Sequence, residues 1–134
     1  MRPASATRGS VLDERGFTLV ELLVVLVVIG VLLAIAVPAY LQFKDRAQQS
    51  AGAADVREAT YAAESYFSDN QTYTGISAPQ LRLIDSGLSP DLKTVKAENG
   101  GVGYCISADV GSWWAHVEGP GGQIVTKETT DNCP

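Results

Sequence analysis

The chain has 134 residues, of which 46% are hydrophobic and 19% charged, and its formal net charge is −5. This length is enough for one modest domain. The acidic balance argues against attraction to the phosphates of nucleic acid, so no nucleic-acid partner is expected. Lys93 and Lys96 lie close together, but we interpret them as part of a solvated loop. Two cysteines and one histidine are too few for a zinc site, and we expect no metal or other cofactor.

Residues 1–16 form a polar segment that is set apart by its charge. Three arginines against Asp13 and Glu14 give this segment a net charge of +1, whereas the rest of the chain carries −6. A basic residue before an apolar run tends to stay on the cytoplasmic side of a membrane. We therefore expect residues 1–16 to remain inside the cell and the acidic remainder to lie outside the cytoplasm.

Residues 17–43 are the most hydrophobic stretch of the chain. The 22 residues of the range 22–43 include no charged side chain. A helix of that length spans roughly 33 Å, close to the thickness of the hydrocarbon core of a bilayer. The stretch has no alternation of apolar and polar faces, so it does not predict a soluble amphipathic helix. We interpret it as a membrane span.

Three residues are unusual for a simple membrane anchor. Glu21 places a carboxylate at the start of the span. A charge near the bilayer is unfavourable in free energy, so a cationic partner is expected. Gly30 and Pro38 interrupt the run, and Pro38 removes a backbone donor, so the helix is expected to kink or loosen there. An ordinary single-pass anchor does not explain Glu21. A cleaved secretory signal ending at Ala34-Ile35-Ala36 is disfavoured by Glu21 and by the two acids that precede it.

The junction at Gly16 carries a recognisable motif. Residues 15–21 read Arg-Gly-Phe-Thr-Leu-Val-Glu and lead directly into the apolar run. This pattern resembles the class III signal of type IV pilins and of the related type II secretion pseudopilins. The resemblance implies that a prepilin peptidase removes residues 1–16 by cutting after Gly16. It also implies that the same enzyme methylates the new amino terminus on Phe17. A leader of this length is longer than is common in type IVa pilins, although the mature start and the small head resemble that class.

The resemblance also implies a role for the residues inside the span. Cleavage after Gly16 creates an α-amine four residues from Glu21, and the two charges can neutralise each other between neighbouring subunits of a filament. Removing one partner would leave the other buried and unpaired, which is the costly outcome. Gly30 and Pro38 match positions where the helices of this family loosen in assembled filaments. We therefore predict assembly roles for Glu21, Gly30 and Pro38.

The helix is expected to continue well beyond the membrane. Residues 44–69 are rich in alanine, and their apolar side chains recur at spacings of three and four, which predicts an amphipathic helix to about Ser68. Turn-forming residues around Asn70 should end it. Residues 70–100 carry scattered glycines and prolines, and we interpret them as a connecting loop with one helical turn at most.

Residues 101–134 change to β-prone runs. Short runs at 102–108, 113–117 and 123–126 are separated by good hairpin connectors. We therefore predict an α+β fold, the pilin fold by resemblance, in which the long N-terminal helix packs against a small antiparallel sheet of three or four strands. Cys105 and Cys133 predict one disulfide outside the cytoplasm, with two free thiols as the alternative. The family resemblance makes the enclosed segment the pilin disulfide loop.

No catalytic constellation is visible, so we do not expect an enzyme. His116 is the sole histidine, and no serine or cysteine is placed in the sequence to form a catalytic triad with it. The most favoured function is a structural subunit of a type IVa-like pilus, inserted in the inner membrane and then polymerised on the cell surface. The implied partners are further copies of the chain, the prepilin peptidase and methyltransferase, and an inner-membrane assembly platform with its ATPase. The alternatives are a type II secretion pseudopilin, whose major forms typically use calcium in place of a disulfide, and a DNA-uptake minor pilin.

Overall fold

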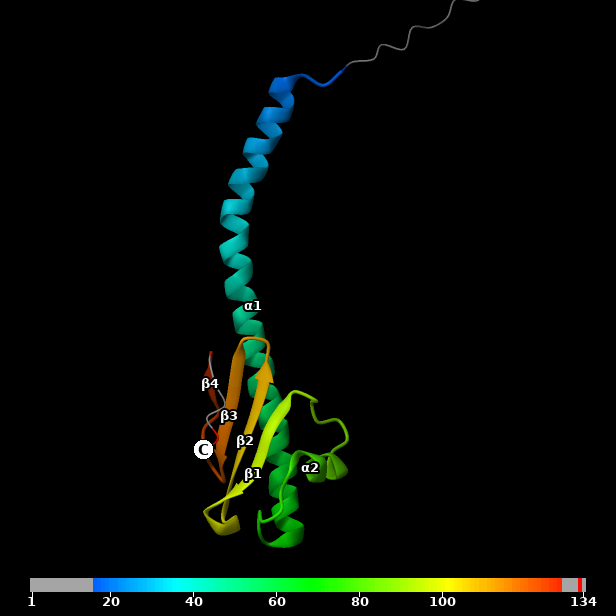
Figure 1. The fold of residues 1–134 in the computed structure, drawn as a ribbon, viewed down its shortest axis with the longest axis vertical. Helices are drawn as coiled ribbons and strands as arrows, with labels where there is room; N and C mark the ends of the chain where they lie inside the picture. The colour runs from blue at the N-terminus through cyan, green and yellow to red at the C-terminus, as the bar shows by residue number, and fades with distance from the viewer. Residues whose placement is uncertain (1–15, 129–132, 134) are drawn as a thin grey trace, which may run out of the picture. The chain divides into compact units, whose positions relative to one another are not determined.

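The structure, a computed structural model, describes residues 16–128 and Cys133. These described residues form two helices and four strands, with one short 3₁₀ turn between the first two strands. Figure 1 labels the helices and strands. Of the predicted leader, all but Gly16 lies outside the described residues. The elements in chain order are α1 (Leu19–Asn70), α2 (Ala78–Ile84), β1 (Leu92–Glu98), η1 (Asn99–Gly101), β2 (Gly103–Val110), β3 (Trp113–Gly119) and β4 (Val125–Lys127).

Contacts divide the chain into two compact units, Met1–Pro38 and Ala39–Pro134. In the first unit, every described residue of α1 is solvent-exposed, including leucines, valines and Ile29. By length and composition, α1 contains a stretch that is apolar enough to cross a membrane. An apolar helix with no buried face needs lipid or protein around it, because water is a poor solvent for it.

The second unit contains the sheet. Its strands follow the order β1-β2-β3-β4, and all three neighbouring pairs are antiparallel. The predicted α+β fold, with a long N-terminal helix and a small antiparallel sheet, is confirmed with four strands. Ile106 lies opposite Val95 on one side and Val117 on the other, which places these three side chains on the same face of the sheet.

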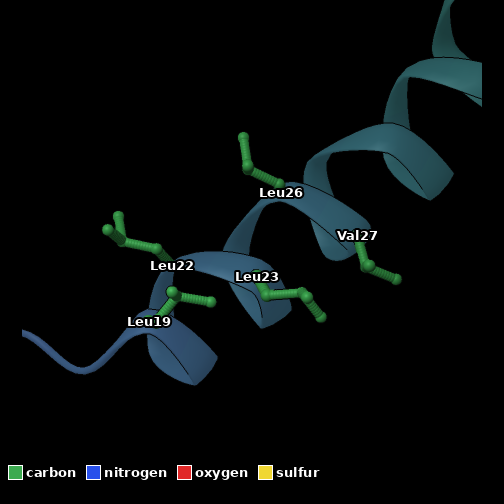
Figure 2. Close-up of a pocket in the computed structure, with 5 residues that line it drawn as sticks. All are labelled: Leu19, Leu22, Leu23, Leu26 and Val27. Carbon is green, nitrogen blue, oxygen red and sulfur yellow. The ribbon is translucent and has the colours of Figure 1, made fainter.

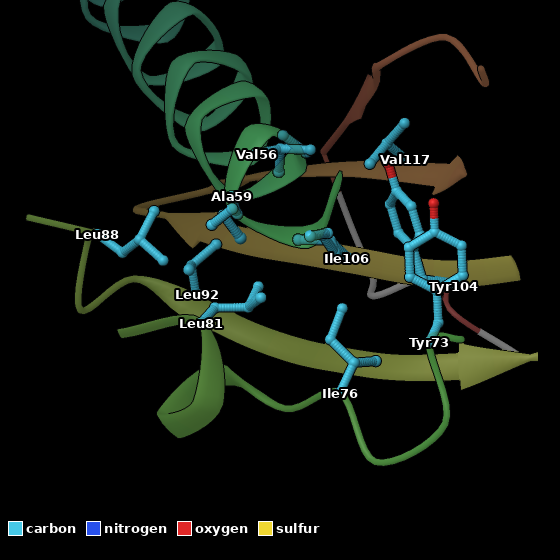
Figure 3. Close-up of a cluster of buried hydrophobic side chains, with 14 residues drawn as sticks. Val56, Ala59, Tyr73, Ile76, Leu81, Leu88, Leu92, Tyr104, Ile106 and Val117 are labelled. Carbon is cyan, nitrogen blue, oxygen red and sulfur yellow. The ribbon is translucent and has the colours of Figure 1, made fainter. Parts of the chain in front are cut away.

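The core of this unit lies between α1 and that face of the sheet (Figure 3). The helix contributes one valine and three alanines, and the sheet contributes larger side chains opposite them. Small residues on the helix allow its backbone to come close to the strands. Gly52 is the clearest case, because an added Cβ would lie 3.2 Å from the Cβ of Ala115. The buried members from the helix and the strands are Val56, Ala59, Ala62, Ala63, Leu92, Tyr104, Ile106, Ala108, Ala115 and Val117. The segment between helix and sheet adds Tyr73, Ile76, Leu81 and Leu88.

The segment between helix and sheet differs from the prediction. Residues 70–100 were expected to form a connecting loop, but they contain the strand β1 as well as the helical turn α2. The sequence of β1, Leu-Lys-Thr-Val-Lys-Ala-Glu, includes two lysines, an alanine and a glutamate, which have low strand propensity. It forms a strand because it pairs with β2. The pattern of residues along the sequence does not predict such a pairing.

The end of α1 agrees with the predicted turn. The helix stops at Asn70, two residues beyond the expected Ser68. Gln71 then takes a left-handed conformation with φ of 56°, while its backbone N–H still donates to the carbonyl of Phe67 at 2.7 Å. That left-handed residue ends the helix, because it turns the following carbonyl groups away from the helix axis.

The short helix α2 offers a matched pair of leucines for testing the core. Leu81 is fully buried, whereas Leu83 is 81% exposed two residues later. We expect Leu81→Ala to lower the free energy of unfolding by about 2–5 kcal/mol, since it leaves a cavity. Leu83→Ala should change it by less than about 0.5 kcal/mol. Urea unfolding of the two variants measures the difference, and equal effects would mean that α2 does not belong to the core.

A polar network lies at the edge of the core, next to the end of α1. The hydroxyl of Tyr73 donates to Oε2 of Glu64 at 3.0 Å, and the hydroxyl of Tyr104 donates to Oε1 at 3.0 Å. Both tyrosines are almost completely buried, and their ring centroids are 4.8 Å apart (Figure 3). Burial, followed by the hydrogen bond to Glu64, raises the pKa of Tyr73 to about 12. Burial likewise raises the pKa of Tyr104.

These raised pKa values predict a loss of stability at high pH. A tyrosine in the unfolded chain ionises near pH 10, whereas the folded protein keeps both hydroxyls protonated to higher pH. The stabilising contribution is therefore present below about pH 10 and is lost as the pH rises through about 12. Urea midpoints at a series of alkaline pH values should fall more steeply for the native chain than for a Tyr73→Phe, Tyr104→Phe variant. Parallel curves would contradict the prediction.

Candidate processing and assembly site

The predicted cleavage junction lies just before α1. Gly16 and Phe17 are exposed and outside the helix, with the ring of Phe17 81% exposed. The helix begins at Leu19. The peptide bond between Gly16 and Phe17 is therefore exposed and non-helical, which suits a peptidase, since proteases do not bind backbone that is held in a helix. Cleavage and methylation at these residues remain predictions.

Thr18 and Glu21 form a reciprocal cap at the start of α1. The backbone N–H and the hydroxyl of Thr18 donate to Oε2 of Glu21 at 2.9 and 2.8 Å. The backbone N–H of Glu21 in turn approaches the hydroxyl oxygen of Thr18 at 3.3 Å. This is the capping-box arrangement of a threonine followed three residues later by glutamate. It satisfies backbone donors that the helix itself cannot pair.

The cap leaves Glu21 able to bind a further donor. Within the described residues, both hydrogen bonds to the carboxylate end on Oε2, so Oε1 has room for another partner. An ionised carboxylate offers about four acceptor positions. Sequence analysis predicted a role for Glu21 but assigned none to Thr18. The pattern Thr-x-x-Glu before an apolar run is the signal that identifies Thr18 as the residue orienting the acid.

An apolar face follows directly behind this cap. Figure 2 shows side chains that project from successive turns of α1. They line a shallow hollow of about 480 Å³ whose surface is almost entirely hydrocarbon. The five residues are Leu19, Leu22, Leu23, Leu26 and Val27, and their spacing of three and four places them along one side of the helix. Such a face is suited to lipid chains or to another apolar helix.

Gly30 and Pro38 lie within α1, which the structure shows as one uninterrupted helix. An added Cβ at Gly30 would meet nothing within 4 Å, so neighbours within the described chain do not explain the glycine. Pro38 is the last residue of the first compact unit. The predicted loosening at these two positions remains a prediction for the assembled state.

The two cysteines form the predicted disulfide. Cys105 is fully buried on β2, and its Cα lies 5.6 Å from that of Cys133. The bond joins the second strand of the sheet to the end of the chain, with a sequence separation of 28. A covalent link at this place restrains Cys133 next to β2.

The structure does not assemble a catalytic centre around His116. Ser107 lies directly opposite His116 on the neighbouring strand, but Ser107 is fully buried and its hydroxyl has no hydrogen-bond partner. Nδ1 of His116 is also buried without a partner, so the two side chains are not hydrogen-bonded as a nucleophile and its base must be. Within residues 16–128 and Cys133, no three His, Cys, Asp or Glu side chains are grouped to hold a metal ion.

Comparison with known proteins identifies the family. Residues 12–37 match the family model described as the prokaryotic N-terminal methylation motif. The type IV wide pilus major component PilA4 of Thermus thermophilus is 31% identical over 132 residues, which cover 91% of this chain and 98% of the relative. The chain belongs to the type IV pilin and pseudopilin superfamily.

Other members of this superfamily resemble the chain over different lengths. The type IV major pilin protein PilA of Myxococcus xanthus is 39% identical over 61 residues, or 46% of this chain. The type II secretion system core protein G of Escherichia coli is 28% identical over 131 residues, which cover 89% of this chain and 90% of the relative. The chain spans 28% of the length of the Myxococcus protein and about half of several other pilins that it matches.

Proposed function

We propose that this protein is the structural subunit of a type IV pilus. In this proposal the chain is inserted in the inner membrane, cut after Gly16, methylated on Phe17 and stacked with further copies into a filament on the cell surface. No step of this process requires the chain to be an enzyme. The membrane-inserted chain is a substrate of the prepilin peptidase and methyltransferase, and the assembly platform with its ATPase moves it into the filament.

One observation carries the proposal: an apolar helix with no buried face begins with an oriented carboxylate. Every side chain of the range 17–38 is exposed, so this part of α1 is not covered by any of the residues that the structure describes. Glu21 is held by Thr18 and keeps one oxygen open. Capping of the helix occupies only Oε2 of this acid, whereas a polymer can also satisfy Oε1 with the amine that cleavage creates on the next copy.

Intact mass spectrometry of the mature protein tests the processing steps. The expected mass is that of a chain beginning at Phe17, with one added methyl group and two hydrogens fewer because of the Cys105–Cys133 bond. Treatment with a reducing agent should restore the two hydrogens. Native protein that begins at Met1 or at Val37 would contradict the proposal, because Phe17 would then have no free α-amine to pair with Glu21.

A type II secretion pseudopilin is the second candidate. The match to the Escherichia coli core protein G over 89% of the chain supports it. The disulfide favours the pilin, since the family resemblance gives the major pseudopilins calcium instead. Deletion of the gene distinguishes the two candidates. A pilin deletion removes surface filaments seen by electron microscopy and leaves protein secretion unchanged, whereas a pseudopilin deletion stops secretion.

A further inference from the structure

A cleft that is separate from the proposed pair of Glu21 and the amino terminus lies beside the network of Glu64 and the two tyrosines. Its volume is about 490 Å³, within the usual range for pockets that bind small molecules. The cleft lies wholly in the second compact unit, where the end of α1 meets the turn between β1 and β2. The residues that line it include Glu64, Phe67, Thr72, Tyr73, Val102 and Pro120.

The acid in this cleft is held in a defined orientation. Each oxygen of Glu64 accepts one tyrosine hydroxyl at 3.0 Å, and both tyrosines are fixed by burial. Two accepted bonds leave about two acceptor positions of the carboxylate unused. The two hydroxyls donate to Glu64, so the carboxylate is the acceptor at the centre of the network.

No cation inside the described chain neutralises this carboxylate. Within residues 16–128 and Cys133, neither oxygen of Glu64 forms an ion pair with a lysine, an arginine or the histidine. The glutamate is exposed at the cleft, so a cation can reach it from solvent. A preoriented acid avoids the entropy cost of ordering a side chain when a partner binds.

The rest of the cleft suits a cation that carries a hydrocarbon arm. Phe67 and Tyr73 line it, and their rings lie next to each other with centroids 4.8 Å apart. Aromatic rings attract ammonium and guanidinium groups, and more strongly when water is partly excluded. Val102, which is 72% exposed, and Pro120 give an apolar wall against which an alkyl chain can pack.

We propose that this cleft binds a primary ammonium group carried on a short alkyl arm. The ammonium contacts the carboxylate of Glu64 and the half-buried ring of Phe67, which packs against the buried ring of Tyr73, while the arm lies against Val102 and Pro120. Two sources have this chemistry: a free alkylamine, and a lysine side chain of a second copy of the chain. Binding of the free amine does not depend on filament formation, so this proposal can stand or fall separately from the proposed function.

Titration of the full-length chain in detergent micelles with n-butylammonium chloride tests the proposal by NMR. We expect saturable shifts of the amide signals of Thr72, Gly101 and Val102, with a millimolar Kd. Butanol has a similar alkyl arm without the charge and should give no saturable shift. Sodium chloride at the same ionic strength corrects for salt effects.

Glu64→Gln keeps an oxygen acceptor and removes the charge, so it should weaken butylammonium binding by about tenfold or more. The matched control is Glu58→Gln, which removes an exposed charge from the same helix, away from the cleft, and should leave binding unchanged. Equal binding by the two variants, or equal shifts with butanol and butylammonium, would overturn the proposal. Because the butanol comparison uses the native chain, it decides the question even where a variant folds poorly.

Carbodiimide cross-linking distinguishes the two sources. This reagent joins a carboxylate to a lysine amine in direct contact, with loss of water. A cross-link between Glu64 and a lysine of an isotopically labelled second copy in sheared filaments assigns the site to contacts between subunits. Saturable amine binding without that cross-link assigns it to a free alkylamine.

Discussion

Replacing Glu21 with alanine is expected to leave cleavage after Gly16 intact and to block or scramble filament assembly. In our proposal, the variant leaves the amine of the neighbouring copy buried without a counter-charge. Breaking a buried ion pair in this way costs about 3–5 kcal/mol. That is a loss of roughly two to four powers of ten in the equilibrium constant of each contact. The amount of sheared filament measures assembly, and the mass of the membrane-bound chain measures processing.

A second variant separates the charge of Glu21 from its capping role. Glu21→Gln retains a side chain that can complete a capping box with Thr18, but it carries no charge. If the charge matters, Glu21→Gln fails to assemble as Glu21→Ala does. If capping alone matters, Glu21→Gln forms filaments. Glu58→Ala, an exposed acid elsewhere on α1, serves as the control. Normal filaments from Glu21→Ala would contradict the buried-pair mechanism.

Loss of the disulfide is expected to lower the stability of the second unit strongly. The bond closes a loop with a sequence separation of 28, and a loop of that size predicts a stabilisation of about 3–4 kcal/mol. Most small domains have only about 5–15 kcal/mol in total. Cys133→Ala should therefore lower the urea midpoint substantially.

The choice of variant avoids confusing the bond with the core. Cys105 is fully buried, so changing it also alters packing, whereas Cys133→Ala leaves that side chain in place. The native chain treated with a reducing agent should unfold at the same urea concentration as Cys133→Ala. A native midpoint that reduction does not move would show that the bond adds nothing to stability.

The long apolar helix was predicted well because its signals are local. A run of 22 residues without a charge predicts a membrane span whatever surrounds it. In the structure the whole run lies within the helix α1. The cysteine pair was also predictable, since two cysteines outside the cytoplasm have a single way to form an internal bond. The end of α1 was predicted to within two residues, because turn formers cluster just after it.

The features that the prediction missed depend on contacts between distant residues. β1 reads as a loop because its lysines and glutamate disfavour a strand, and only its pairing with β2 makes it one. The cleft at Glu64 was missed for the same reason. Glu64 is separated from Tyr104 by 40 positions, so no spacing in the sequence relates the acid to the hydroxyl that orients it.

By itself, the sequence determined that this protein has an N-terminal methylation motif, an apolar helix long enough to cross a membrane with an acid at its start, and a small β-containing head. Those conclusions rest on the composition and order of neighbouring residues, which act through local propensity and hydrophobicity. The tertiary structure alone decided that the sheet has a fourth strand and that Glu64 accepts hydrogen bonds from two buried tyrosines. These features arise when folding brings remote segments together, because hydrogen bonds and burial depend on distance in space and not along the chain.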